Sequence, residues 1–233
     1  MDSTGLITSL VILGVLLIAG LAIYISIYLK KKRRQELQFM ARQFGLRYSQ
    51  EDPFGLLAYP FALFRKGDGR GLENVLAGKW QELEVKEFDY WYYEESRDSD
   101  GSTSRTYYRF SCVVTDIDAA CPPLTIGREN FFTRMADSLG FRDIEFELGE
   151  FNKNFQVKGK DRKFAHDLVD ARMMQWLMGA GEGWSFEVSG NQVMCFAKRR
   201  GPTELIPLFG TLKAFREHVP RVVYELYGSG AAR

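Results

Sequence analysis

The chain has 233 residues, and its 31 basic and 30 acidic side chains give a formal net charge of +1. Without Asp2 and the five cations at 30–34, 26 basic and 29 acidic side chains remain, so the bulk of the chain is slightly acidic. Nucleic-acid binding needs clustered cations that neutralise phosphates, and this composition argues against it. The three cysteines are odd in number and widely spaced, which predicts no disulfide framework and fits a reducing compartment.

An uncharged apolar run occupies residues 6–29. As a helix it is about 36 Å long at about 1.5 Å per residue, enough to cross a hydrocarbon core of about 30 Å, so we expect a transmembrane helix. A secretory signal peptide would carry basic residues before the run, whereas here only Asp2 precedes it. Five cations follow it instead: Lys30, Lys31, Lys32, Arg33 and Arg34. The positive-inside rule therefore predicts that residues 1–5 lie outside the cell and that the chain after residue 29 is cytoplasmic.

The five cations are also predicted to touch anionic lipid, because each surface-adjacent cation contributes about 1 kcal/mol to such binding. After them, Leu37, Met40, Ala41 and Phe44 recur at helical spacing, which predicts a basic, amphipathic juxtamembrane helix over 30–45. Its apolar stripe should be docked on the domain that follows. We place that cytoplasmic domain at 46–228 and a short tail at 229–233.

Segments 74–80, 83–93 and 105–117 are rich in Val, Phe, Tyr and Trp and predict strands. The polar stretch 96–104 makes the last two a long antiparallel hairpin. Large rings fall on both of its faces near the tip, and we predict that four of them bind a partner: Tyr90, Trp91, Tyr92 and Tyr107. The alternative is ordinary packing inside the domain. Cys112 should be buried on the apolar face of the second strand.

The second half alternates short strands and helices. Pro122 and Pro123 predict a break before a short strand at 124–126, and Asn130 is the expected cap of a helix ending at Gly140. The remaining expected elements are strands at 144–148 and 151–157, one helix from Asp161 past Met178, a hairpin of 184–188 and 193–197 turning at Gly190–Asn191, and helices opened by Pro202 and Pro220. Strands in hairpins with helices between them predict an α+β domain with a mostly antiparallel sheet and packed helices.

Few side chains suggest chemistry. His166 has Asp170 four residues later on the expected helix, so an oriented general base is one interpretation and an exposed surface pair is the favoured one. Asp143, Glu145 and Glu147 would share one strand face, where they could bind a cation or face solvent, and solvent exposure is the usual outcome. Cys121, beside two prolines, is the one cysteine expected to be exposed. No zinc-ligand spacing occurs, so we predict no metal site and no cofactor.

A family resemblance is carried by Asp143–Glu147, Glu150–Val157, Asp161, Phe164–Ala165 and Ala171–Met174, with Asn74–Gly78 and Phe88–Tyr90 upstream. Through these residues the chain resembles a bacterial family of N-terminally membrane-anchored proteins known only as a domain of unknown function. The resemblance implies an N-terminal anchor and an α+β domain, and it implies no activity and no catalytic residues. The function we predict is a membrane-tethered protein-interaction module, with the lipid bilayer and a membrane-proximal protein as partners. The alternative is a small-ligand-binding sensor or an enzyme with a site near His166.

Overall fold

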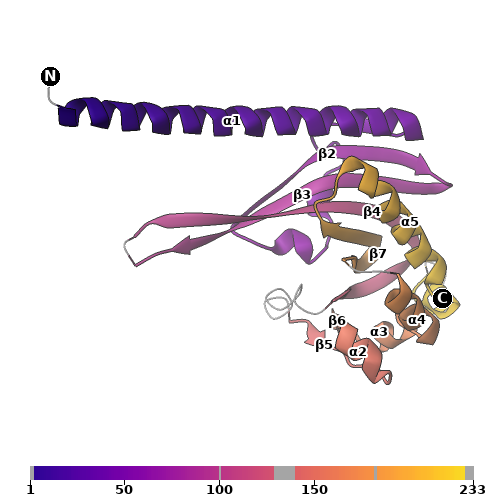
Figure 1. Cartoon of the computed structure of the whole chain (residues 1–233). Helices are drawn as coiled ribbons and strands as arrows, with labels where there is room; N and C mark the ends of the chain where they lie inside the picture. Colours follow the sequence, from indigo (N-terminus) through magenta and orange to yellow (C-terminus); the bar gives the residue numbers. More distant parts are fainter. Residues whose placement is uncertain (1–2, 100, 129–139, 181–182, 229–233) are drawn as a thin grey trace.

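Helix α1 (Ser3–Phe44) extends far beyond the rest of the chain in the computed structural model, which describes residues 3–99, 101–128, 140–180 and 183–228 (Figure 1). It is one helix of 42 residues and therefore about 63 Å long. Its apolar portion is exposed, and it is long and apolar enough to span a membrane. Near its end the side chains of Leu37, Met40 and Ala41 are buried against the domain. The predicted docking of this stripe is confirmed.

The domain is built on one antiparallel sheet, as predicted. Its order is β1-β2-β3-β4-β6-β5, and β7 pairs with β4 as well. The strands are β1 (Arg47–Ser49), β2 (Gly69–Trp80), β3 (Leu83–Arg97), β4 (Thr103–Arg128), β5 (Arg142–Asp143), β6 (Phe155–Gly159) and β7 (Ser185–Lys198). The predicted long hairpin is the pair β3–β4, with Arg97 opposite Thr103 at its tip.

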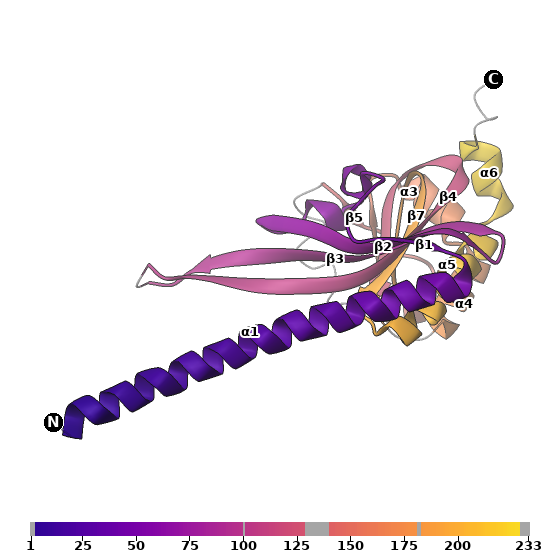
Figure 2. The same cartoon turned by 90° about the horizontal axis from the view of Figure 1, so that it is seen from above.

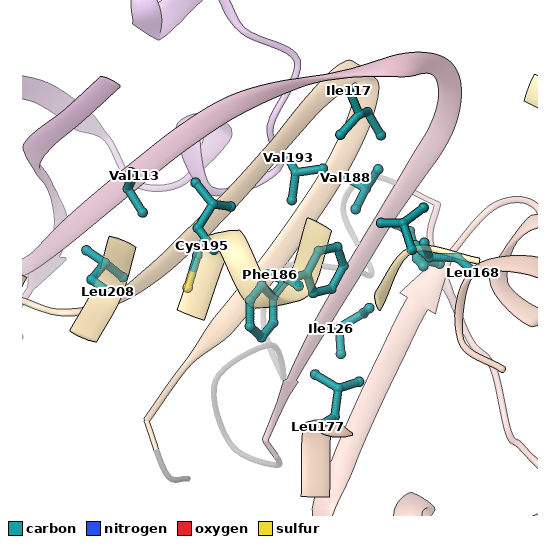
Figure 3. Packing of buried hydrophobic residues seen from close by; sticks show 14 of the residues in the cluster. Val113, Ile117, Ile126, Leu168, Leu177, Phe186, Val188, Val193, Cys195 and Leu208 are labelled. Atoms are coloured by element: carbon teal, nitrogen blue, oxygen red, sulfur yellow. The ribbon is translucent and has the colours of Figure 1, made fainter. Parts of the chain in front are cut away.

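Strand β4 does not break at its two prolines, and the predicted hairpin at Gly190–Asn191 is wrong. β7 is one continuous strand that follows β4 from the pair Phe110–Lys198 to the pair Ile126–Phe186. The register shifts on both sides of Cys121, so the prolines fall where no regular ladder bond is needed. Gly190 pairs with Cys121 and has a φ of 59°, a left-handed conformation that lets β7 bend with β4. The two strands therefore curve together around the core (Figure 3).

The helices also differ from expectation. Helix α2 (Gly149–Asn154) replaces most of the strand predicted at 151–157. The strand predicted at 144–148 does not form, and the neighbouring residues Arg142–Asp143 form β5 instead. The single helix predicted from Asp161 is two, α3 (Arg162–Leu168) and α4 (Ala171–Gly179). Asp170 caps α4 by accepting a hydrogen bond from the Met173 amide, just as Asp161 caps α3. The helix predicted from Asn130 lies outside the described residues.

Two apolar layers cover the sheet. On one face lie the end of α1, helices α3 and α4, the 3-10 turn η4 (Pro202–Glu204), α5 (Leu205–His218) and α6 (Arg221–Tyr227). Phe186 stacks on Phe215 of α5 there, with ring centroids 4.5 Å apart. Figure 3 shows part of this layer, including Val113, Phe186 and Leu208. On the other face, the 3-10 turns η1 (Leu56–Ala58) and η2 (Leu63–Arg65) cover Phe88, Tyr90 and Phe196.

Buried polar groups hold these layers in place. The Glu187 carboxylate accepts hydrogen bonds from the amides of Ala62 and Leu63 and so fixes the start of η2. Burial raises the pKa of Glu187 to about 7, although these two hydrogen bonds act to lower it. Cys112 is buried as predicted, whereas the expectation that Cys121 is exposed is wrong. Burial raises the pKa of the Cys121 thiol to about 12, so the thiol is not a reactive nucleophile.

Candidate functional site

Helix α1 is joined to the sheet by a buried ion pair. Arg33 of α1 donates from Nε to Asp89 Oδ2 at 2.6 Å and from Nη2 to Asp89 Oδ1 at 2.5 Å. Its third nitrogen, Nη1, donates to the carbonyl of Arg200 at 2.7 Å. The two side chains of the pair are only 12% and 4% exposed. A two-point contact between guanidinium and carboxylate fixes the rotation of α1 as well as its distance from β3.

Asp89 collects further donors around the same carboxylate. The Asn74 amide donates to Oδ2 at 2.9 Å, and Arg199 Nη2 lies 3.4 Å from the same oxygen. Asn74 itself is held in a left-handed backbone conformation, with a φ of 60°, where β2 becomes irregular. Tyr48 of β1 donates to the other end of the Asn74 amide at 2.7 Å. We call Arg33, Asn74, Asp89 and Arg199 the Asp89 network.

The Asp89 network changes the role expected for Arg33. Its charge is neutralised inside the protein, so it is not a lipid-facing cation, and the prediction for this residue is corrected. Burial acts to lower the pKa of the Arg33 guanidinium, but the hydrogen bonds to Asp89 together with the charges of Asp89, Glu87 and Glu36 outweigh it, and the pKa is raised. Lys30, Lys31 and Lys32 are exposed, and Arg34 is half-buried. These four remain candidates for lipid contact.

Glu87 lies beside the network on the same side of β3. It is fully buried, and neither carboxylate oxygen has a hydrogen-bond partner among the described residues. Burial raises the pKa of Glu87 well above its ordinary value, and the nearby Asp89 charge raises it further. The raised pKa favours the neutral form of the Glu87 carboxyl.

The β3–β4 hairpin projects from the domain in the direction taken by the N-terminal half of α1, and the two diverge toward their ends (Figures 1 and 2). β3 loses its outer neighbour after the pair Gly69–Tyr93, and β4 loses β7 after the pair Phe110–Lys198. Beyond these positions the hairpin is a two-stranded ribbon. A two-stranded ribbon of this kind is at best marginally stable without further contacts.

Aromatic and arginine side chains cover one face of the hairpin. The Tyr93 and Tyr107 rings are 5.4 Å apart, and Trp91 lies 6.0 Å from Tyr107. Arg105 lies over Tyr93 and Arg109 over Tyr107, at 4.7 and 5.1 Å from the ring centroids. These five residues form what we call the aromatic face. Tyr107 is 44% exposed, and Arg105 and Arg109 are exposed as well.

Half of the predicted partner-binding set belongs to the core instead. Tyr90 and Tyr92 are 1% and 4% exposed, and they pack with Phe64 and Phe110 on the opposite face of the sheet. Tyr90 also donates a hydrogen bond to the Leu63 carbonyl at 2.9 Å. These two residues are therefore removed from the set. Trp91 and Tyr107 remain candidates, and Tyr93 joins them because its side chain lies on the same face.

A groove lies where α1 meets the start of α5. It has a volume of about 460 Å³ and is lined mainly by apolar atoms, including those of Phe39, Phe44, Pro202 and Ile206. Phe39 is 70% exposed, the largest value for a big apolar side chain outside the apolar run of α1 within the described ranges. Ile206 is 41% exposed. Exposed apolar side chains that gather at a groove are typical of a binding surface.

The site considered near His166 is not assembled in the part of the chain that the structure describes. His166 is exposed, its ring packs on Phe146, and its Nε2 lies 3.5 Å from Nε of Arg162. Asp170, expected beside it, caps α4. A general base oriented by a carboxylate is therefore not formed. The acidic stretch after residue 142 also gives no cluster: Asp143 lies 3.6 Å from Lys158, and the described residues contain no group of acids, histidines or cysteines suited to a metal ion.

Sequence reasoning missed the groove and the Asp89 network. Phe39 is a large apolar residue that lies outside the stripe formed by Leu37, Met40 and Ala41. This position is the one feature of the sequence that could have indicated the groove. The partners of Arg33 come from β3 and the segment after β7, so no local spacing could have indicated them.

No family model and no curated protein matches the chain. Among solved structures, it resembles the crystal structure of the mycobacterial trehalose monomycolate transport factor A, TtfA. The TM-score is 0.59 with 12% sequence identity, and the likeness covers 79% of this chain and 93% of TtfA. At this identity the likeness concerns the fold alone. The resemblance to a bacterial family of unknown function stays a prediction.

Proposed function

We propose that this chain is a single-pass membrane protein that acts as a membrane-tethered interaction module. In this proposal residues 6–29 of α1 cross the cell membrane, residues 1–5 lie outside, and the α+β domain lies in the cytoplasm. The exposed cations Lys30, Lys31 and Lys32 support this orientation through the positive-inside rule. Arg33 then couples the anchor rigidly to the sheet, because α1 continues unbroken from the apolar run to the Asp89 network.

The observation that carries the proposal is the exposed Phe39 ring at the groove between α1 and α5. It lies about 14 Å along the helix from Lys30, at about 1.5 Å per residue, and so close beneath the proposed bilayer. Tethering raises the local concentration of other membrane proteins there, so a groove of modest affinity suffices for binding. The occupant that we propose is an apolar segment of a membrane-proximal protein, which would place its side chains between Phe39 and Ile206.

TtfA is described as a transport factor for trehalose monomycolate. This chain shares the fold of that protein at a TM-score of 0.59. Because the identity is 12%, we transfer neither the cargo nor any partner to this chain.

Photocrosslinking in intact cells tests the proposed protein contact. A photoreactive phenylalanine analogue at Phe39 or Ile206 should capture one and the same membrane-associated protein. The matched control is the same analogue at Arg42, which is exposed on α1 and does not line the groove. If the probes at Phe39 and Ile206 give only products that the Arg42 probe also gives, the groove is not a protein-binding site. The proposed module then loses its main support.

A further inference from the structure

The aromatic face of the hairpin lies on the side of the sheet from which α1 departs. Side chains along a strand alternate between faces, so Asp89, Trp91 and Tyr93 share one face of β3. Asp89 binds Arg33 of α1, which identifies this face as the one turned toward the helix. Opposite Trp91 and Tyr93 on β4 are Arg109 and Tyr107. The aromatic face is therefore the face of the hairpin that is turned toward α1.

The position of the rings along α1 can also be estimated. Asp89 marks the level of Arg33, and Tyr93 is four residues closer to the hairpin tip, or about 13 Å at about 3.3 Å per residue. Along α1 that distance corresponds to roughly nine residues at about 1.5 Å each, from Arg33 to the region of Tyr24. With the hairpin parallel to α1, Trp91, Tyr93 and Tyr107 would thus lie level with the last turns of the proposed membrane helix, just inside its boundary with the headgroups.

The hairpin tip restricts how the domain can be oriented. Arg97 and Asp98 are charged and exposed, and Arg97 is about 26 Å beyond Asp89 at about 3.3 Å per residue. A hairpin parallel to an upright α1 would carry these charges into the hydrocarbon, which is costly. Because the hairpin diverges from α1 (Figure 2), a tilt of α1 within the usual range of about 0–40° turns the hairpin toward the membrane surface and its tip away from the hydrocarbon. Its aromatic face is then directed at the lipids.

We propose that the aromatic face, formed by Trp91, Tyr93, Arg105, Tyr107 and Arg109, binds the headgroup region of the bilayer. This inference rests on the proposed membrane anchoring of α1. Trp and Tyr place apolar rings among acyl chains and polar atoms among headgroups, and arginine binds lipid phosphate in the same layer. The anchor and the hairpin together make two contacts with one membrane, which would fix the tilt of the domain and hence the direction in which the groove beside Phe39 points.

Spin labels on the full chain in nanodiscs of phosphatidylcholine and phosphatidylglycerol test this inference. The three native cysteines are buried, so introduced surface cysteines can be labelled selectively. Labels at Tyr107→Cys and Arg109→Cys probe the aromatic face, and Thr106→Cys, exposed on the other face of the same strand, is the matched control. A label at Ile18→Cys reports on α1. Collisions with lipid-soluble oxygen and with a water-soluble nickel complex are measured for each.

The expected result is a ratio of oxygen to nickel collisions several-fold higher at 107 and 109 than at 106, with the highest ratio at 18. If 18 is in lipid while 107 and 109 match 106, the hairpin contact is refuted and the anchor stands. If 107 and 109 are shielded from both reagents, protein covers the face, and the bilayer contact is refuted too. If 18 is in water, the anchor itself fails, and the inference fails with it.

Discussion

Replacing Asp89 with alanine is expected to lower the free energy of unfolding by about 3–5 kcal/mol, the usual cost of removing one partner from a buried ion pair. The change would leave Arg33 and Arg199 facing each other in a buried region without their shared counter-charge. It would also remove the acceptor of the amide of Asn74, a residue with a left-handed backbone conformation. Urea unfolding of the full chain in detergent measures the loss.

The matched control for this variant is Glu95→Ala. Glu95 is on the same strand and pairs with Arg105 at 2.8 Å, but both side chains are substantially exposed. Exposed pairs contribute about 0–1 kcal/mol, so this variant should unfold close to the wild type. Equal losses for Asp89→Ala and Glu95→Ala would show that the Asp89 network stabilises the fold no more than a surface ion pair does.

The second large effect is expected at Leu37, whose side chain is fully buried between α1 and the sheet. Leu37→Ala should cost about 2–5 kcal/mol, because it removes buried methyl groups and leaves a cavity. Much of this cost should appear as local undocking of the end of α1. Limited digestion with trypsin would then cut faster at Arg42, which is exposed but helical in the docked state.

Phe39→Ala is the control for Leu37→Ala, since Phe39 is two residues away on the same helix and largely exposed. Its effect on stability should stay within about 0.5 kcal/mol, as for other surface substitutions. Phe39→Ala should also leave the rate of cleavage at Arg42 unchanged. If the two variants are cleaved equally fast, the docking of α1 through Leu37 is not what protects this segment.

The fold class, the apolar helix and the β3–β4 hairpin can be predicted from the sequence because each depends on local periodicity. The docked stripe Leu37, Met40 and Ala41 has the same origin. Predictions fail where tertiary contacts override local signals. Two prolines normally end a strand, yet Pro122 and Pro123 lie in a β4 that continues, because they coincide with a register shift against β7. Likewise Asp170 has the spacing of a partner for His166, whereas its side chain caps a new helix.

The candidate surfaces are only partly predictable for a related reason. The concentration of rings in the hairpin is visible in the sequence, but which rings are core depends on what covers each face. Phe64 and its neighbours cover Tyr90 and Tyr92, and this segment precedes β2 in the chain without any pattern that assigns it to one face. In the sequence Arg33 cannot be told apart from the four cations beside it, because all five have the same charge and follow the apolar run. Only its contact with Asp89, which is distant in the sequence, distinguishes it.

Both proposed surfaces depend on the anchoring of a cytoplasmic domain by one transmembrane helix. The topology of the full chain tests this anchoring directly. Green fluorescent protein and alkaline phosphatase are fused in turn after Arg233, and an epitope tag is placed before Met1. We expect a fluorescent fusion, an inactive phosphatase fusion and an epitope that stays with the full-length membrane protein. An active phosphatase, or loss of the epitope by cleavage after the apolar run, would refute the proposed anchoring.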